Sequence, residues 1–383
     1  MKNANIRKVF MIGLLILFPF ISQCSKEPNE NVSPSDKQPA QGVSSAPADK
    51  NPPKTEPVPP KTEPVVVKPE PPKPVEPEPK VTFPEANAEN LKALKIEDLY
   101  TKFVDVSTKE IIDFDTMIQR LKGIQAIYTA ESHTSPEEHK LQLDIITALY
   151  KNNKKVAVGF EFLQRPMQPE VDKYSAGKIT EQELLKTISV TFGKWYRYYQ
   201  PIWQFIGKNN IKAVAMNVDN ALKSKYYKVG WDGLTEDEKK LVAKDIDTTN
   251  KEHRAYVMPQ FEGMAKMGMP VDLERLYWGQ CVWDETFGES IANYLKETND
   301  PEAQIVVVLG RGHAEYKFNT PNRALKRYDK MTFKTIIPIE LNKQGEVDFE
   351  KLLASGIGDF LAFTPVSVDP DRPQMPKMPK MPK

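Results

Sequence analysis

Short apolar segments that run directly into polar residues recur along the middle of the chain. Each segment is rich in Val, Ile or Ala and is short enough to form a buried strand. The segments cover 124–128, 156–158, 211–216 and 305–309, and they lead into Glu131 and His133, Glu161, Asn217, and His313. Because parallel strands of an open α/β sheet end at one edge, where ligands bind, we expect these polar side chains to converge there.

The stretches between these strands have the apolar spacing of helices. This spacing predicts helices over 108–121, 141–149, 180–188, 200–208, 236–267 and 273–296, and a last strand over 334–341. Thr180 and Glu183 have the spacing of a capping box, and Pro136 marks the first turn of the helix that carries His139. Alternating strands and helices indicate an α/β fold with a mostly parallel central sheet, helices on both faces and the site at the carboxyl ends of the strands.

Composition divides the chain into four parts. Residues 1–23 begin with basic residues and continue with an apolar run over 9–21, which is shorter than the about 20 residues that span a bilayer and predicts a lipoprotein signal peptide. Residues 24–85 are rich in Pro, Lys and Glu, as in a disordered tether. Residues 86–368 hold the apolar segments and should form the α/β domain, whereas 369–383 repeat the sequence MPK and should form a disordered tail.

Cys24 follows the apolar run in a context that resembles the lipobox of bacterial lipoproteins. Processing would make Cys24 a diacylated N-terminus, with palmitate or similar chains, and two acyl chains give stable membrane attachment. The alternative is an ordinary secretory signal. Cys281, the second of the two cysteines, stands in an apolar stretch that favours a buried, unreactive thiol. We therefore expect an exported protein, anchored by lipid to the bacterial cell envelope and facing the periplasm or the surface.

Charge and missing motifs exclude several classes of function. The formal net charge is +1, from 53 basic and 52 acidic residues, so nothing favours nucleic acid as a partner. The sequence has no G-x-S-x-G elbow, P-loop or paired C-x-x-C, which removes the usual α/β-hydrolase, nucleotide-binding and zinc-ribbon classes. It also has no C-x-x-C-H motif, so covalent c-type haem is excluded.

The polar residues at the strand ends suit two kinds of chemistry. Carboxylates and neutral imidazoles can bind a divalent metal and activate water, for which Glu131, His133 and His313 are the candidates. Without a metal, a glutamate and a histidine can act as general base and orienting partner. The catalytic candidates of such an enzyme are Glu131, His133, Glu161 and His313. A purely structural hydrogen-bonded cluster is the third alternative.

Two segments carry the aromatic and Met side chains that a flat apolar macrocycle requires. They cover 195–205 and 253–269, and the second includes His253 and Tyr256. Histidine and tyrosine are both axial ligands of haem iron in proteins. His253 and Tyr256 are therefore the candidate haem ligands, although the same stripes also suit an ordinary hydrophobic core.

Five motifs, in order, resemble the ChaN-like haem-binding uptake lipoproteins, whose superfamily also includes erythromycin esterases and the Tiki and TraB proteins. The motifs are AESH at 130–133, GFEF at 159–162, AVAMN at 213–217, QCVWDETFGESIA at 280–292, and GRGHAEY at 310–316 with PNRA at 321–324. The resemblance covers 105–327. The family usually has glycine where this chain has Ala130, and the shared motifs do not fix the haem ligand.

The resemblance implies an α/β fold and noncovalently bound haem. It is also compatible with a homodimer that holds haem between its subunits. In the enzymatic relatives Glu131, His133, Glu161 and His313 would form the catalytic or metal-binding cluster. We therefore expect a lipid-anchored protein that binds haem or a related iron porphyrin for haem and iron uptake. The main alternative is a metal-dependent hydrolase that uses the Glu/His cluster on an ester or a peptide, and the third is an interaction module with an idle site.

Overall fold

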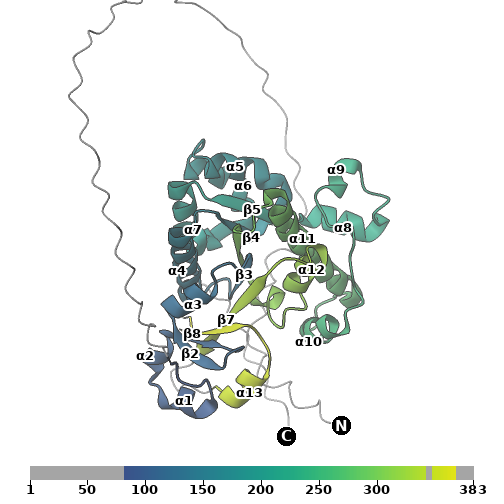
Figure 1. Cartoon of the computed structure of the whole chain (residues 1–383). Helices are drawn as coiled ribbons and strands as arrows, with labels where there is room; N and C mark the ends of the chain where they lie inside the picture. The colour runs from purple at the N-terminus through teal and green to yellow at the C-terminus, as the bar shows by residue number, and fades with distance from the viewer. Residues whose placement is uncertain (1–81, 342–346, 368–383) are drawn as a thin grey trace, which may run out of the picture. The chain divides into compact units, whose positions relative to one another are not determined.

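Eight strands form one sheet in the order β2-β1-β8-β7-β3-β6-β4-β5 (Figure 1). The computed structural model describes residues 82–341 and 347–367. All pairings between β8 and β5 are parallel, whereas β1 is antiparallel to both of its neighbours. The strands are β1 (Lys102–Asp105), β2 (Glu110–Asp113), β3 (Ala126–Glu131), β4 (Val156–Gln164), β5 (Lys212–Asn217), β6 (Gln304–Gly310), β7 (Phe333–Leu341) and β8 (Phe360–Pro365). The predicted mostly parallel α/β sheet is confirmed.

Helices occupy most of the connections between these strands. They are α1 (Ala88–Ala93), α2 (Ile96–Leu99), α3 (Phe114–Arg120), α4 (Pro136–Asn152), α5 (Gln168–Ser175), α6 (Glu181–Phe192), α7 (Tyr196–Asn209), α8 (Asn220–Val229), α9 (Glu236–Lys239), α10 (Lys251–Lys266), α11 (Leu273–Thr298), α12 (Thr320–Arg327) and α13 (Phe349–Ala354). Three short 3-10 turns are η2 (Arg165–Met167), η3 (Gly193–Trp195) and η4 (Arg311–His313). In the described ranges no helix is long and apolar enough to cross a membrane.

Alternate residues of the central strands pack into two apolar layers, one on each face of the sheet. In β3, Ile127 packs into the layer built with α3 to α7, while Ala126 and Tyr128 pack into the layer built with α1, α11, α12 and α13. This alternation follows from the two-residue period of a strand. Burial on both faces explains why β3 and β6 are mostly apolar and were recognisable from the sequence.

Two predicted helices differ from the structure. The first half of 108–121 is strand β2, because Ile111 and Ile112 pair with β1; the helix begins only after Asp113, whose side chain accepts a hydrogen bond from the Thr116 N–H. The predicted helix over 236–267 is two helices, since α9 ends at Lys239 and α10 begins anew with Asn250 as its cap. The capping box at Thr180 and the helix start at Pro136 are confirmed.

The predicted signal peptide, the lipidation site Cys24, nearly all of the tether and the C-terminal tail lie outside the described residues. The predicted strand over 334–341 is confirmed as β7. β7 pairs with β8, a strand that was not predicted because the end of the sequence has no clear apolar pattern.

Candidate functional site

The structure brings Glu131, His133, Glu161 and His313 together at the carboxyl edge of the sheet. Glu131 ends β3 and lies opposite Gly310, the last residue of β6. Glu161 follows the last paired residue between β4 and β6, so it lies within β4 at the same edge and not after the strand as predicted. A Cβ added at Gly310 would lie 2.7 Å from His133 Cε1 and 3.3 Å from Glu161 Oε2, which places all three groups side by side.

Asn217 supports this edge without joining the cluster. Its Nδ2 donates to the Glu161 carbonyl at 2.7 Å, and its Oδ1 accepts from the Val218 N–H at 2.8 Å. The side chain therefore ties the end of β5 to the end of β4.

Glu131 is the buried centre of one half of the cluster. Its Oε1 accepts hydrogen bonds from His133 Nδ1, at 2.9 Å, and from the Tyr199 hydroxyl. Its Oε2 accepts from Gln142 Nε2, at 2.8 Å. Burial alone would raise the pKa of Glu131, but His139, His133 and Tyr199 outweigh it and lower the pKa below its ordinary value.

His139 turns inward from the first turn of α4. Its Nδ1 lies 3.3 Å from Glu131 Oε2, and its Nε2 donates to the His133 carbonyl at 3.2 Å. Gln142, one turn later, also donates to the Thr129 carbonyl at 3.0 Å. The start of α4 thus fixes both the Glu131 carboxylate and the turn that carries His133.

His313 lies between two carboxylates in the other half of the cluster. Its Nδ1 donates to Asp284 Oδ1 at 2.8 Å, and its Nε2 lies 3.5 Å from Glu161 Oε1. Burial disfavours the imidazolium, but Asp284 and Glu161 outweigh it and raise the pKa of His313 to about 10. Burial likewise disfavours the Glu161 carboxylate, but His313, His133 and the Gly310 N–H lower the pKa of Glu161 to about 2.

These pKa values determine what the cluster can do at neutral pH. An efficient general acid or base has a pKa near the pH at which it works. With pKa values of about 10 and about 2, His313 is a cationic donor and Glu161 is an anionic acceptor over the whole neutral range. In the free protein His313 and Glu161 therefore form a buried ion pair at neutral pH.

Sequence reasoning missed Asp284, which links the cluster to a second buried network. Asp284 is fully buried in α11 and also accepts from the Thr320 hydroxyl at 2.8 Å. Its Oδ2 lies 3.4 Å from His253 Nε2, and His253 Nδ1 accepts from Arg323 Nη2 at 3.1 Å. The available signal was the acidic pair Asp284-Glu285 inside an otherwise apolar stretch, because buried charges require partners.

The two candidate haem ligands lie in different surroundings. His253 is fully buried, between Asp284 and Arg323. Tyr256 is half-buried and donates from its hydroxyl to Glu315 Oε2 at 2.5 Å. Burial and Glu315 raise the pKa of Tyr256 well above its ordinary value. The Tyr256 ring lies 5.6 Å from each of the rings of Tyr316 and Phe318, which stack on each other.

Aromatic rings border the cluster on both sides. Trp195 stacks on the ring of His133 at 5.7 Å between centroids, and Phe162 meets the same ring edge-on at 4.9 Å. Phe287 and Trp283 flank the ring of His313 at 5.1 and 6.5 Å. The His133 side chain is 16% exposed and that of His313 is 7% exposed, so His133 is the more accessible of the two.

The structure gives the predicted metal site no support. Within the part of the chain that is described, no group of three or more His, Cys, Asp and Glu side chains is arranged to hold a metal ion. The candidate ligand His133 directs Nδ1 to Glu131, and His313 directs its two ring nitrogens to Asp284 and Glu161.

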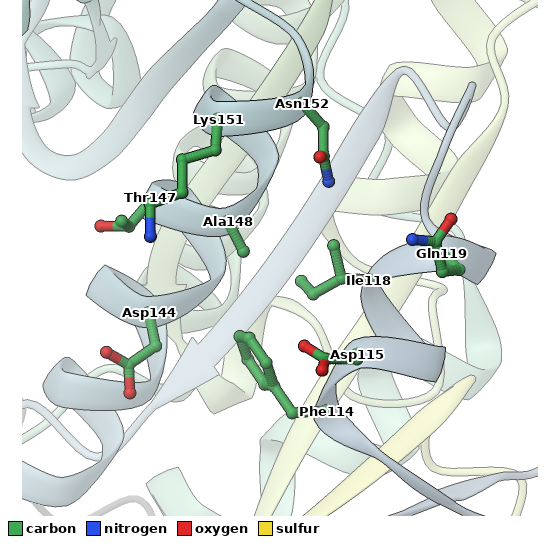
Figure 2. A pocket seen from close by; sticks show the side chains of 9 residues that line it. All are labelled: Phe114, Asp115, Ile118, Gln119, Asp144, Thr147, Ala148, Lys151 and Asn152. Atoms are coloured by element: carbon green, nitrogen blue, oxygen red, sulfur yellow. The ribbon is translucent and has the colours of Figure 1, made fainter.

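A separate groove of about 510 Å³ lies between α3 and α4 (Figure 2). Phe114 and Ile118 on α3 and Ala148 on α4 form its apolar part, and Asp115 and Asp144 add carboxylates. None of its lining residues belongs to the Glu/His cluster. We therefore assign the groove no part in the site.

Comparisons with known proteins identify the family and the fold. The family model described as "Haem-binding uptake, Tiki superfamily, ChaN" matches residues 117–324, which include every member of the cluster. No curated protein matches the chain. ChaN of Campylobacter jejuni, solved with cofacially bound haem, has the same fold with a TM-score of 0.52 and 16% identity, over 68% of this chain and 95% of that chain.

Two other solved structures are more distant. The type III effector HopBA1 matches with a TM-score of 0.39 and 11% identity, over 66% of this chain and 92% of its own. An erythromycin esterase mutant of EreC in its open conformation matches with a TM-score of 0.37 and 10% identity, over 63% of this chain and 77% of its own.

Proposed function

Because the chain belongs to the ChaN family of haem-binding uptake proteins in the Tiki superfamily, we propose that it binds haem or a related iron porphyrin noncovalently and serves in haem uptake from a lipid anchor. The family match carries this proposal, since it includes β3, β4, β5 and β6, at whose carboxyl ends the cluster lies. We place the haem beside Tyr256, which is half-buried and contacts Glu315, five residues after the end of β6.

The residues around Tyr256 fit such a ligand. A haem site needs a flat apolar surface for the porphyrin and a histidine or tyrosine side chain to ligate the iron. When haem is bound, its iron would supply the coordination chemistry. The stacked rings of Tyr316 and Phe318 beside Tyr256 offer the surface. A tyrosine would ligate ferric iron as phenolate. Burial and Glu315 oppose the loss of the Tyr256 hydroxyl proton in the free protein, so the positive charge of the iron would have to outweigh them.

His253 is the weaker of the two ligand candidates. Its ring is fully buried, and both of its nitrogens face partners, Asp284 Oδ2 at 3.4 Å and Arg323 Nη2 at 3.1 Å. To reach an iron, the ring would have to leave a charged partner buried and uncompensated, which is costly. Among the residues that the structure describes, Tyr256 has one polar contact to exchange, and its carboxylate partner remains paired with Arg311.

Haemin titration of the Tyr256→Phe variant tests this assignment. We expect the variant to bind haemin at least about 10-fold more weakly than wild type, with a shifted Soret maximum, because one iron–ligand bond is lost. Tyr294→Phe, on α11 outside the group around Tyr256, is the matched control and should behave as wild type. An unchanged spectrum and affinity in Tyr256→Phe would remove Tyr256 as the ligand, and loss in His253→Gln instead would assign that histidine.

We further propose that Cys24 carries the lipid anchor. The support is the sequence context of Cys24, at the end of an apolar run that is too short to span a bilayer. Cys24→Ala should move the protein from the membrane to the soluble fraction of cells, because stable attachment needs two acyl chains. Cys281→Ala, which changes a buried thiol, is the control and should remain in the membrane fraction. Membrane association that persists without Cys24 would contradict the anchor.

A further inference from the structure

Lys223, on α8, is a cation without an anionic partner. Its ammonium lies 3.3 Å from the centroid of the Trp283 ring, on α11. Among the described residues none forms an ion pair or a hydrogen bond with the side chain of Lys223, which is half-buried. Burial, together with the nearby guanidinium of Arg275, lowers the pKa of Lys223 to about 7. Partial burial without a counter-charge disfavours the charged form of a lysine, and a bound anion would stabilise it.

The Lys223 side chain is held in place along α11. Its Cδ, Cε and Nζ each lie 3.8 Å from the position of a Cβ added at Gly279, so the chain runs over this glycine to reach Trp283. The distance is an ordinary van der Waals contact, and the ammonium ends on the indole face. Packing against α11 therefore fixes where the ammonium of Lys223 lies.

Trp283 itself contributes a second donor that lacks an acceptor. Its Nε1 is buried, and no atom of the described chain accepts its hydrogen. A buried N–H without a partner costs about 1–3 kcal/mol. Two donors without acceptors thus lie on adjacent side chains, and one carboxylate could satisfy both.

These donors border the Glu/His cluster. The Trp283 ring packs against the ring of His313, with centroids 6.5 Å apart. Helix α8 starts three residues after β5, which ends at the same carboxyl edge as β3 and β6. Trp283 and the start of α8, which carries Lys223, therefore both lie beside the carboxyl edge of the sheet.

We propose that Lys223 and the indole N–H of Trp283 bind a carboxylate of the ligand, which in haem is a propionate. This inference rests on the proposed haem binding and names the group that orients the porphyrin. The cation–π contact alone stabilises an ammonium only modestly, whereas an ion pair with a bound carboxylate supplies the missing counter-charge. Arg275, whose guanidinium lies 5.0 Å from the Tyr227 ring on the same side, adds a further positive charge.

The test compares haemin with haemin dimethyl ester, in which both propionates are blocked, in the same dilute detergent. We expect Lys223→Met to weaken haemin binding by about 10- to 100-fold, as for the loss of one charge-assisted contact, and to change ester binding by less than about 3-fold. Lys228→Met removes an exposed lysine from the same helix and should change neither affinity. Lys223→Arg retains the charge and should retain most of the haemin affinity.

The outcomes separate this inference from the proposed function. Haemin affinity unchanged in Lys223→Met, or an equal loss with haemin and with the ester, would overturn the carboxylate site while haem binding stands. If the wild-type protein binds neither porphyrin, haem binding fails and the inference fails with it. Thermal unfolding of each variant verifies that a loss of affinity does not reflect a loss of fold. Trp283→Phe, which keeps an aromatic ring but removes the indole N–H, should show a smaller loss with haemin only.

Discussion

Asp284→Ala is expected to lower the free energy of unfolding by about 3–5 kcal/mol, as when one partner of a buried ion pair is removed. Asp284 is fully buried, and it accepts hydrogen bonds from His313 Nδ1 and the Thr320 hydroxyl, both at 2.8 Å. Without it the His313 imidazolium keeps only Glu161, whose Oε1 lies 3.5 Å away. Urea unfolding of both proteins measures the loss.

The pH dependence of this loss identifies its cause. The pKa of His313 is about 10 in the folded protein, against about 6.5 when unfolded. The imidazolium therefore stabilises the wild-type fold fully below about pH 6.5, and this contribution disappears as the pH rises through about 10. The difference between wild type and Asp284→Ala should shrink over that interval. A difference that stays constant would show that Asp284 acts through packing and not through charge.

Glu274→Ala is the control for the loss of a carboxylate on the same helix. Glu274 pairs with Arg254 near the start of α11, and its side chain is 66% exposed. Exposed ion pairs contribute at most about 1 kcal/mol. The control should therefore unfold close to wild type at every pH, and a loss as large as that of Asp284→Ala would point to a general effect on α11.

Gly310→Ala is expected to lower the free energy of unfolding by about 1–3 kcal/mol, as for other overpacked core positions. The added methyl would lie 2.7 Å from His133 Cε1, closer than any normal carbon contact. The His133 ring cannot easily withdraw, because Trp195 stacks on it and Phe162 meets its edge. The near-ultraviolet circular dichroism of Trp195 should change along with the stability.

Two further variants control this prediction. Gly263→Ala, in α10 with nothing within 4 Å of the new methyl, should raise the stability by up to about 1 kcal/mol through helix propensity. His133→Ala combined with Gly310→Ala should recover part of the loss, because the clashing ring is gone. Equal stability of Gly310→Ala and wild type would contradict the close packing of this strand end.

Much of the sheet could be predicted because its central strands are buried on both faces. β3, β5, β6 and β7 are recognisable as short apolar runs without reference to their neighbours. β1 and β2 have four residues each and are strands because they pair with each other and with β8. Such pairing is a tertiary property that a local pattern does not contain.

The site residues at the strand ends could be predicted from the sequence. The site residues that helices contribute could not. Glu131, Glu161 and His313 meet because parallel strands end at one edge. Asp284 and Tyr199 reach the same place from α11 and α7, and no sequence spacing relates these helices to the strand ends. The sequence around His253 showed aromatic and Met residues. It did not show that Asp284 and Arg323 lie on the two sides of the His253 ring.

The most direct measurement of the proposed function is a haemin titration of the purified full-length wild-type protein, followed by its Soret absorbance and by iron analysis after gel filtration. We predict a saturable change at a fixed ratio of haem to chain, with iron that stays with the protein through the column. A signal that grows without saturation, or iron that separates from the protein, would contradict haem binding and leave the carboxyl edge of the sheet without its proposed ligand.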